Sequence, residues 1–421
     1  MTKTVRIGVI GGGSVFTPEL IDQLATHADA IGAMEIRLMD VDAHRLSIVS
    51  GLCRRIAERF DASLLIEDVT TYDDAIAGAD FVLVQLRQGG IEARIKDEKL
   101  GLKYRLPFTE TISVCGFATY LRTYPVAETI AEAVQRLAPN AWLMNFTNPA
   151  GQLAETFARL GCTKVVGVCN ASLGLLDFLA DRLGASSDDI FMTWRGLNHL
   201  TFTDAIYYQG RNILPDLLET WGDDEEESPF PGDLVRTLGV IPNGYLQYYY
   251  LRDQIVDKLQ SQEKVRSEVV QDVEHVLLET FARVSTVPEE LTQRGGYGYS
   301  RLVALLIRGI LGDDRSIRYA IVKNGSTLPE LPSDAFIEVP VVVKSDGIRA
   351  LQVEPLPAFA RGLVVTMKQY ERVLIEAAIA RDQRLLRQAL LIHPLMPSYD
   401  RAQALLTDIL TITREYAPGY L

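Results

Sequence analysis

The stretch Val5-Arg-Ile-Gly-Val-Ile-Gly-Gly-Gly-Ser14, followed by Thr17-Pro-Glu-Leu20, decides the fold of this chain. Its apolar residues predict a buried strand, and its glycines let the backbone turn sharply and approach a ligand, since no Cβ intervenes. Pro18 suits the first turn of a following helix, whose free N–H groups suit a pyrophosphate. A second strand ends in Asp40, where dinucleotide folds place a ribose-binding acid. We therefore predict a dinucleotide site, with a plain tight turn as the alternative.

The predicted cofactor-binding residues follow from this stretch and from one further segment. The usual fingerprint has a third glycine, and Phe16 stands in its place. Arg87 follows another expected strand and has two glycines close behind it, which favours close approach to a ligand. The predicted set is Gly11, Gly12, Gly13, Ser14, Phe16, Asp40 and Arg87.

Size and composition exclude several classes of protein. The chain has 421 residues, 48% of them hydrophobic and 23% charged, which suits two domains with a substantial core. The net charge of −13 argues against nucleic acid as a partner, although a local arginine cluster still attracts small anions. We see neither a signal peptide nor an apolar run near the ~20 residues that span a bilayer, so we expect no membrane partner. The four cysteines do not suggest a disulfide framework, and we expect a cytoplasmic protein.

Strand and helix patterns alternate up to about residue 170 and then change. In the first part, strands are expected at 36–39, 64–67, 80–84, 141–144 and 164–168. Such alternation predicts an α/β fold with a doubly wound parallel sheet that binds ligands at the carboxyl ends of its strands. In the second part, strands are expected at 317–322 and 337–343, helices at 244–258, 264–285 and 358–416, and a solvated acidic loop at 223–228. We predict a Rossmann-type domain at 1–170 and an α+β substrate domain at 171–421.

Two polar residues at strand ends are candidate metal ligands. Cys169 ends a buried strand, and His199 ends another strand-like run. Thiolate and imidazole suit a soft or borderline divalent ion, and two protein ligands leave positions for a substrate. Each residue also fits a structural role, since a lone cysteine is more often a small core residue and a lone histidine a hydrogen-bonding group.

Tyr245 and several arginines are candidates for contact with a substrate. Tyr245 lies among tyrosines that would ordinarily form a packing surface, and it serves as a base only if a cation lowers its pKa from about 10. Arginine forks recognise phosphate or carboxylate, although most arginines are surface residues. The arginines in distinctive settings are Arg87, Arg94, Arg266 and Arg294.

Six motifs follow one another between residues 10 and 249, and the similarity that they carry runs along nearly the whole chain. They are Ile10-Gly-Gly-Gly-Ser14, Val84-Gln-Leu-Arg-Gln-Gly-Gly90, Leu143-Met-Asn-Phe-Thr-Asn-Pro-Ala150, Gly167-Val-Cys-Asn170, Gly196-Leu-Asn-His-Leu200 and Asn243-Gly-Tyr-Leu-Gln-Tyr-Tyr249. With these motifs the chain resembles glycoside hydrolase family 4, the NAD- and metal-dependent glycosidases that do not use two carboxylates. The resemblance implies an architecture like that of lactate and malate dehydrogenases, NAD and Mn²⁺ or a related ion as cofactors, and a homodimer or homotetramer.

The resemblance also implies roles for individual residues. Cys169 and His199 would bind the metal, Tyr245 would be the catalytic base, and Glu110 would be the acidic residue that tunes it. The implied and candidate substrate contacts are Arg94, Asn148, Asn170, Arg266 and Arg294. In the α-specific relatives an aspartate follows the metal-binding cysteine. This chain has Asn170 at that position, which is similar to the β-specific 6-phosphoglucosidases. The segments Pro107–Phe117 and Cys169–Ser172 depart from the family pattern beside the expected pocket.

The reaction implied is hydrolysis of 6-phospho-β-glucosides, either phosphorylated disaccharides or aryl glycosides. Hydride leaves C3 of the sugar, the metal polarises the resulting ketone, and Tyr245 removes the C2 proton. The C1 substituent is then eliminated, water adds, and the hydride returns. Other functions stay open: α-galactosidase, α-glucuronidase or 6-phospho-α-glucosidase within the family, an NAD-dependent 2-hydroxy-acid dehydrogenase, or a non-catalytic NAD-binding sensor.

Overall fold

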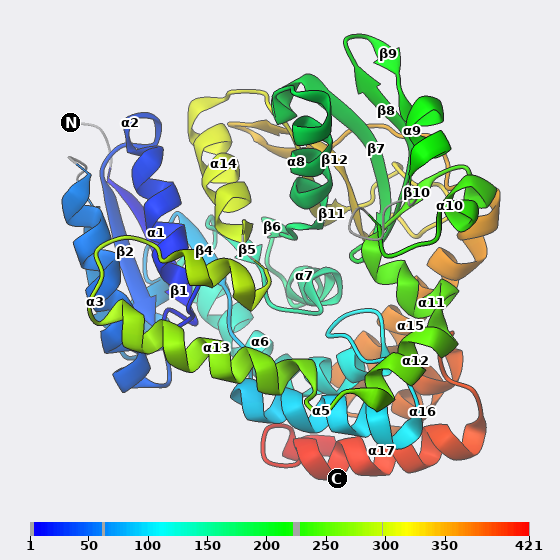
Figure 1. The fold of residues 1–421 in the computed structure, drawn as a ribbon. Helices are drawn as coiled ribbons and strands as arrows, with labels where there is room; N and C mark the ends of the chain where they lie inside the picture. The colour runs from blue at the N-terminus through cyan, green and yellow to red at the C-terminus, as the bar shows by residue number, and fades with distance from the viewer. Residues whose placement is uncertain (1–3, 61–63, 222–227, 297, 421) are drawn as a thin grey trace.

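The computed structural model of the chain describes residues 4–60, 64–221, 228–296 and 298–420 (Figure 1). The loop predicted at 223–228 lies almost wholly outside the described residues. In the described part, the strands form one sheet in the order β10-β8-β7-β12-β11-β6-β5-β4-β1-β2-β3, with β9 and β13 at its side.

Six parallel strands form the first half of this sheet. They are β1 (Val5–Ile10), β2 (Met34–Met39), β3 (Leu64–Val69), β4 (Phe81–Val84), β5 (Trp142–Asn145) and β6 (Val165–Gly167). β1 and β4 are almost wholly buried, which explains why their sequences read as nearly continuous apolar runs. The order β3-β2-β1-β4-β5-β6 is that of dinucleotide-binding folds and confirms the predicted Rossmann-type sheet.

Helices connect the parallel strands. They are α1 (Thr17–Thr26), α2 (Ala28–Ile31), α3 (Ala43–Arg59), α4 (Tyr72–Ile76), α5 (Gly90–Tyr104), α6 (Val114–Leu137) and α7 (Ala150–Arg159). α1 carries Pro18 in its first turn, as predicted. α3 begins after Asp42, whose side chain accepts a hydrogen bond from the backbone N–H of Arg45. These helix starts place loops and free N–H groups at the edge where the strands end.

The second half of the sheet is antiparallel. It contains β7 (Ile190–Leu197), β8 (Leu200–Tyr208), β9 (Arg211–Asn212), β10 (Ile241–Pro242), β11 (Ile317–Lys323), β12 (Phe336–Lys344) and β13 (Gly347–Ala350). β11 joins the parallel half where Ile321 pairs with Gly167 of β6. β12 meets β7 at the pair Glu338 and Gly196. Because the sheet continues past residue 170, the domain boundary there stays a prediction.

The helices of the second half are shorter or more numerous than predicted. They are α8 (Ala171–Leu183), α9 (Leu214–Thr220), α10 (Gly232–Leu238), α11 (Gln247–Tyr250), α12 (Arg252–Ser261), α13 (Arg266–Phe281), α14 (Tyr299–Gly312), α15 (Ala358–Ala380), α16 (Gln383–Ile392) and α17 (Tyr399–Thr413). A continuous helix at 244–258 is wrong, because a 3₁₀ turn at Gly244–Leu246 precedes α11 and the chain breaks at Leu251. Asn243 caps that turn by accepting the N–H of Tyr245.

The two halves share one hydrophobic core. The C-terminal helices return to the first half of the chain. There α17, drawn in red in Figure 1, contacts α5 and α6. Among the described residues, no helix is both long and apolar enough to cross a bilayer. The fold therefore surrounds the carboxyl ends of the parallel strands with segments from both halves.

Candidate active site

A cleft of about 1080 Å³ lies at the carboxyl ends of the parallel strands. Segments from both halves of the chain line it, as expected for this fold. The predicted site residues among its lining are Gly11, Gly13, Ser14, Phe16, Asp40, Arg87, Arg94, Glu110, Asn148, Asn170, His199, Tyr245, Arg266 and Arg294. Two do not line it: the N–H of Gly12 donates to the Met39 carbonyl at 2.8 Å, and Cys169 is only 3% exposed.

The glycine turn after β1 needs its glycines. Gly11 has a φ of +88°, and a Cβ there would lie 2.8 Å from the carbonyl oxygen of Gln85. The Gln85 side chain donates to the Gly11 carbonyl at 3.2 Å and to the Thr17 hydroxyl at 2.8 Å. These bonds fix the turn against the start of α1, so that its backbone borders the cleft.

Asp40 holds the same turn from the end of β2. Its Oδ2 accepts the N–H of Gly13 at 2.9 Å, and its Oδ1 accepts the N–H of Asp42 at 3.0 Å. Arg45 donates through Nε to the Gly13 carbonyl at 2.7 Å. The residue predicted to bind a ribose is therefore fixed beside the glycine turn, and its role toward the cofactor stays a prediction.

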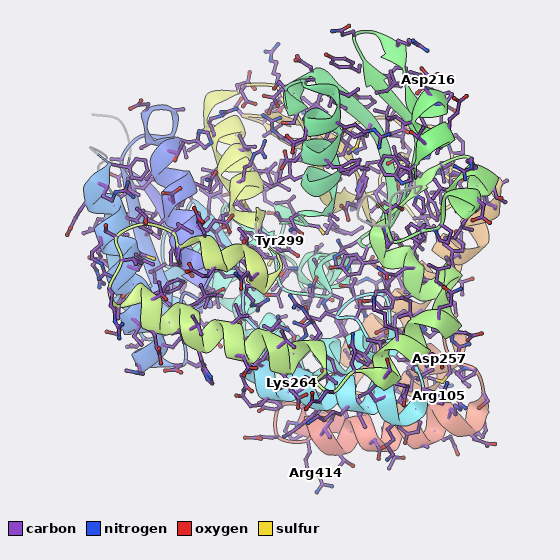
Figure 2. All side chains as sticks on the ribbon, in the orientation of Figure 1. Arg105, Asp216, Asp257, Lys264, Tyr299 and Arg414 are labelled. Carbon is purple, nitrogen blue, oxygen red and sulfur yellow. The ribbon has the colours of Figure 1, made fainter. Side chains whose placement is uncertain are left out.

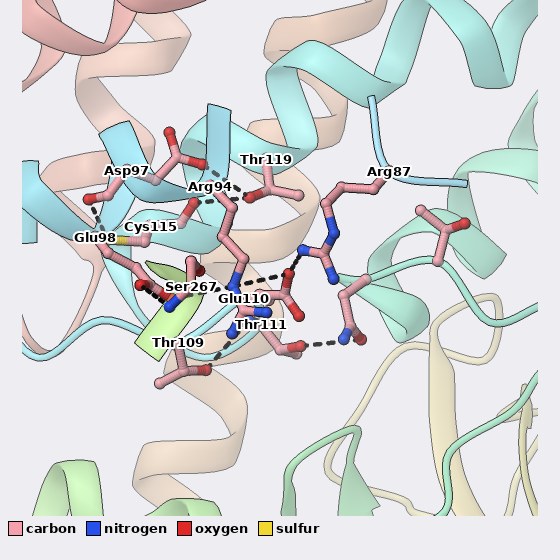
Figure 3. A network of polar contacts seen from close by, with 12 residues as sticks. Arg87, Arg94, Asp97, Glu98, Thr109, Glu110, Thr111, Cys115, Thr119 and Ser267 are labelled. Atoms are coloured by element: carbon pink, nitrogen blue, oxygen red, sulfur yellow. Dashed lines mark hydrogen bonds and ion pairs between the residues drawn. The ribbon is translucent and has the colours of Figure 1, made fainter. Parts of the chain in front are cut away.

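Arg87 and Arg94 flank the carboxylate of Glu110 (Figure 3). The Glu110 carboxylate pairs with Nη1 of Arg87 and with Nε of Arg94, the latter at 3.3 Å. Arg94 Nε also lies 3.0 Å from Glu98 Oε1, one turn further along α5. Desolvation and the nearby charges of Arg94 and Arg294 hold the pKa of Arg87 well below its usual value. Positive charge crowded into a desolvated place favours a bound anion.

Arg266 and Arg294 approach from the other wall of the cleft, formed by α13 and the segment before α14. Arg294 pairs with Glu274 at 2.9 Å, and its guanidinium lies 5.3 Å from the centre of the Phe16 ring. Arg266 donates to the carbonyl of Gln293 at 3.2 Å and to that of Arg294 at 3.3 Å. Burial raises the pKa of Glu274, but the charges and hydrogen bonds of Arg294 and Arg45 together lower it by more. The net shift of this pKa is therefore downward. This wall is thus held by charged pairs.

Asn148 and Asn170 reach the cleft from the ends of β5 and β6. The Thr111 hydroxyl donates to Asn148 Oδ1 at 3.3 Å, which ties Asn148 to the Glu110 loop. Asn170 stands at the N-cap of α8, directly after Cys169. Both amides therefore lie where the structure also gathers the charged residues.

Cys169 and His199 come from two neighbouring connections. Cys169 follows β6, and His199 lies in the turn between β7 and β8 with a φ of +63° and 2% exposure. Burial lowers the pKa of His199 to about 3, so the imidazole is neutral, as a metal ligand must be. Burial and the nearby Glu338 raise the pKa of the Cys169 thiol. A cation is then needed for the thiolate form.

One independent observation supports a divalent ion at Cys169 and His199. Nδ1 of His199 and Oδ1 of the adjacent Asn198 are buried and lack a hydrogen-bond partner among the described residues. Buried polar atoms of this kind normally have a partner, and an unplaced ion is one explanation of an orphan. The described chain contains no group of three or more His, Cys, Asp or Glu side chains able to hold a metal. A site of two protein ligands leaves coordination positions for a substrate.

Tyr245 stacks on His199, with ring centroids 3.8 Å apart and planes inclined by 7°. Burial and the neighbouring Cys169 and Tyr248 raise the pKa of the Tyr245 hydroxyl, while Arg94 lowers it by a smaller amount. The same electrostatic coupling places Cys169 near Tyr245. Tyr245 therefore adjoins both predicted metal ligands, a setting in which a bound cation would favour its ionised form.

Further residues line the cleft besides the predicted ones. Glu98, Tyr248 and Tyr299 line the cleft, and Figure 2 shows Tyr299 in the middle of the molecule at the start of α14. The spacing of Arg94 and Glu98, four residues apart on one helix, was a signal for their ion pair. Tyr299 lies in a segment without such a signal, so only the tertiary structure reveals it.

The models of the family 4 glycosyl hydrolases match most of the chain. The family model itself covers residues 6–185, and that of the family's C-terminal domain covers residues 194–396. This chain belongs to glycosyl hydrolase family 4. The family assignment confirms that it is a glycosidase, and it confirms the resemblance carried by the six motifs.

Relatives and solved structures agree with the family. The 6-phospho-beta-glucosidase BglT of Thermotoga maritima is 34% identical over 418 residues, covering 98% of this chain and 99% of the relative. The 6-phospho-beta-glucosidase of Escherichia coli is 30% identical over 444 residues, covering 100% and 98%. The Thermotoga maritima enzyme solved with manganese, NAD⁺ and glucose-6-phosphate superposes with a TM-score of 0.93 at 33% identity, over 98% of this chain and 99% of that one. Lactate dehydrogenase from Eimeria maxima superposes with a TM-score of 0.57 at 13% identity, over 91% of this chain and 97% of that one. It shares the fold alone, and it confirms the predicted architecture.

Proposed function

We propose that this chain hydrolyses 6-phospho-β-glucosides by transient NAD-dependent oxidation of the sugar. The observation that carries the proposal is that one cleft holds the glycine turn, His199 and the stacked Tyr245. Relatives at 34% and 30% identity over almost the whole chain are named 6-phospho-beta-glucosidases. Solved relatives contain NAD, manganese and glucose-6-phosphate, which supports the same cofactors here.

Two groups of residues would hold the cofactors. The backbone of Gly11, Gly13 and Ser14, the Phe16 ring, Asp40 and Arg87 line the cleft and would bind NAD. Cys169 and His199 would bind Mn²⁺ or a related divalent ion. When bound, NAD⁺ supplies a hydride acceptor for sugar C3 and the ion supplies a Lewis acid for the resulting ketone. The neutral imidazole of His199 is ready to bind, whereas the Cys169 thiol must release its proton.

The remaining residues act on the sugar. Tyr245, beside His199, acts in its ionised form, removes the proton from C2 and becomes a neutral phenol; Arg94 favours the phenolate form before this step because it lowers the pKa of Tyr245. Glu110 orients Arg87 and Arg94. Arg94, Asn148, Asn170, Arg266 and Arg294 contact the substrate, and the arginines suit its phosphate. Asn170, in place of an acidic residue, favours a β-linked leaving group.

A panel of nitrophenyl glycosides tests the proposal. The α- and β-anomers, each with and without a 6-phosphate, are assayed with NAD⁺ and Mn²⁺. We expect nitrophenol only from the phosphorylated β-glycoside, loss of release after chelation, and recovery with Mn²⁺. Product formed in D₂O should carry deuterium at C2, because Tyr245 exchanges that proton.

Other outcomes identify the alternatives. Nitrophenol release without NAD⁺, or product free of deuterium at C2, contradicts the oxidation route. Steady NADH formation with lactate or malate indicates a dehydrogenase, and NAD binding without turnover of any glycoside indicates a sensor. Release from the α-anomer, from an α-galactoside or from a glucuronide moves the chain to another activity of the family. A cytoplasmic location and a homodimer or homotetramer stay predictions.

A further inference from the structure

Glu338 is a buried carboxylate directly behind the turn that carries His199. It lies in β12 and is 1% exposed. Its Oε1 accepts the indole N–H of Trp194 at 2.9 Å, and its Oε2 accepts the side-chain N–H of Asn198 at 3.0 Å. It also accepts the backbone N–H of His199. All three donors belong to β7 or to the β7–β8 turn, so a single carboxylate fixes the base of that turn.

The β7–β8 turn needs such support. His199 has a φ of +63°, which is unfavourable for a residue with a side chain, and Gly196 has a φ of +147°. A Cβ at Gly196 would lie 2.2 Å from the Leu200 carbonyl oxygen, so the two strands are very close there. Glu338 pairs with Gly196 across the sheet. Its hydrogen bonds therefore hold His199 in a conformation that the isolated turn would not favour.

The Glu338 carboxylate also reaches the other predicted metal ligand. The Asn198 amide that donates to Glu338 forms a hydrogen bond with the Cys169 thiol as well. Glu338 and Cys169 are close enough to interact electrostatically. One carboxylate thus lies behind both ligands and is linked to them through Asn198 and the His199 backbone.

Glu338, like Glu19, accepts only from uncharged donors, whereas other deeply buried carboxylates have a basic partner. Asp97 pairs with Arg122 at 2.5 Å, and Glu155 pairs with Lys368 at 3.1 Å. In the part of the chain that the structure describes, no Lys, Arg or His side chain forms an ion pair with Glu338. A buried charge is normally paired or lies near a metal. A divalent cation on Cys169 and His199 would supply the missing positive charge.

We propose that Glu338 is a positioning residue for the metal: its carboxylate sets the geometry of His199 and Asn198, and its charge strengthens cation binding. The proposal rests on the proposed function, because it takes Cys169 and His199 as the ligands. Residues behind metal ligands typically contribute about 10- to 100-fold to metal affinity. Glu338→Gln keeps the size of the side chain and removes its charge. It also turns an N–H₂ group toward one of the present donors.

The test is the affinity of the full-length protein for Mn²⁺ alone, without NAD or substrate, measured from the EPR signal of free Mn²⁺. We expect Glu338→Gln to weaken binding by about 10-fold or more. The rise in Tm that Mn²⁺ causes should shrink in the same variant. Trp194→Phe retains the charge of Glu338 and removes one of its hydrogen bonds, so its loss of Mn²⁺ affinity should be smaller than that of Glu338→Gln. Trp194→Phe also tests the proposal if Glu338→Gln does not fold.

Glu371→Gln is the matched control, because Glu371 is a buried carboxylate that pairs with Lys368 at 2.5 Å. It should lower Tm and leave Mn²⁺ affinity unchanged. If Glu338→Gln binds Mn²⁺ like the wild type while Cys169→Ser and His199→Ala lose it, the positioning role is overturned and the ligand assignment stands. If Cys169→Ser and His199→Ala bind like the wild type, the ligand assignment fails and the role of Glu338 with it.

Discussion

The phenol ring of Tyr245 lies flat against the imidazole of His199, at 3.8 Å between centroids. His199 belongs to the β7–β8 turn, and Tyr245 to the 3₁₀ turn after β10. Asn243 joins the two turns: its side chain donates to the Thr201 hydroxyl at 3.0 Å, and its backbone N–H donates to the Thr201 carbonyl at 2.9 Å. The proposed base and a proposed metal ligand are thus held by one pair of strands.

Tyr245→Phe should abolish most turnover and leave the fold intact. Phenylalanine keeps the ring that stacks on His199 and removes the hydroxyl that takes the C2 proton. Loss of a general base typically costs about 10²- to 10⁴-fold in rate. Steady-state kinetics on the phosphorylated nitrophenyl glycoside, with Tm as the check on folding, measure the effect. Tyr250→Phe, on the neighbouring α11, is the control and should stay active; a Tyr245→Phe enzyme of near-normal rate would refute the base assignment.

Gly11→Ala should lose NAD⁺ binding and stability together. The new Cβ would lie 2.8 Å from the Gln85 carbonyl oxygen, at a φ of +88° that alanine disfavours. We expect a loss of about 1–3 kcal/mol in the free energy of unfolding and a large rise in the Kd for NAD⁺, measured by fluorescence titration. Gly174→Ala in α8 is the matched control. A Cβ there meets nothing within 4 Å, so this variant should gain about 1 kcal/mol and bind NAD⁺ normally.

Arg122→Met should destabilise the protein by about 3 kcal/mol, because it leaves Asp97 buried without its partner. The two side chains are each 2% exposed and form two contacts, at 2.9 and 2.5 Å. Urea unfolding measures the loss. The double variant Asp97→Leu with Arg122→Met should regain much of it, since no unpaired charge then remains. Equal stability of the single and the double variant would contradict this account.

Glu19→Gln should remove a pH dependence of stability. Glu19 of α1 accepts the N–H of Gly298 at 2.9 Å and the Ser300 hydroxyl at 3.1 Å, and burial raises its pKa from 4.5 to about 7. The folded protein then holds this proton more tightly than the unfolded chain, so stability falls as the pH rises from about 4.5 to about 7. The fall is at most about 3 kcal/mol.

The comparison of wild type and Glu19→Gln at two pH values checks the sign. Urea unfolding at pH 5 should give similar stabilities, and at pH 8 the Gln variant should be the more stable one, because it never ionises. If the stability gained by Glu19→Gln over the wild type were larger at pH 5 than at pH 8, the raised pKa of Glu19 would be wrong. Because Glu19 ties α1 to the start of α14, the KM for NAD⁺ should be measured in the same series.

Much of the first half could be predicted, because its signals are local. The apolar run of β1, the glycines after it and Asp40 at the end of β2 lie within a short stretch of chain. Boundaries in the second half were less accurate. The run of tyrosines looked like one helix, but the bonds of Asn243 to Thr201 draw Gly244–Leu246 into a 3₁₀ turn. These hydrogen bonds depend on β8, a strand distant in sequence from the tyrosines, so no local pattern reveals the 3₁₀ turn.

The sequence by itself determined the Rossmann-type half and the family, and it singled out candidate site residues, because glycine turns and short polar motifs act through their own backbone. Only the tertiary structure decided how these residues face one another. The stacking of Tyr245 on His199, the position of Glu110 between Arg87 and Arg94, and Glu338 behind the β7–β8 turn all join separate segments. The physical reason is that these contacts are made when strands pair across the sheet, and the pairing of distant strands is not encoded in any single stretch.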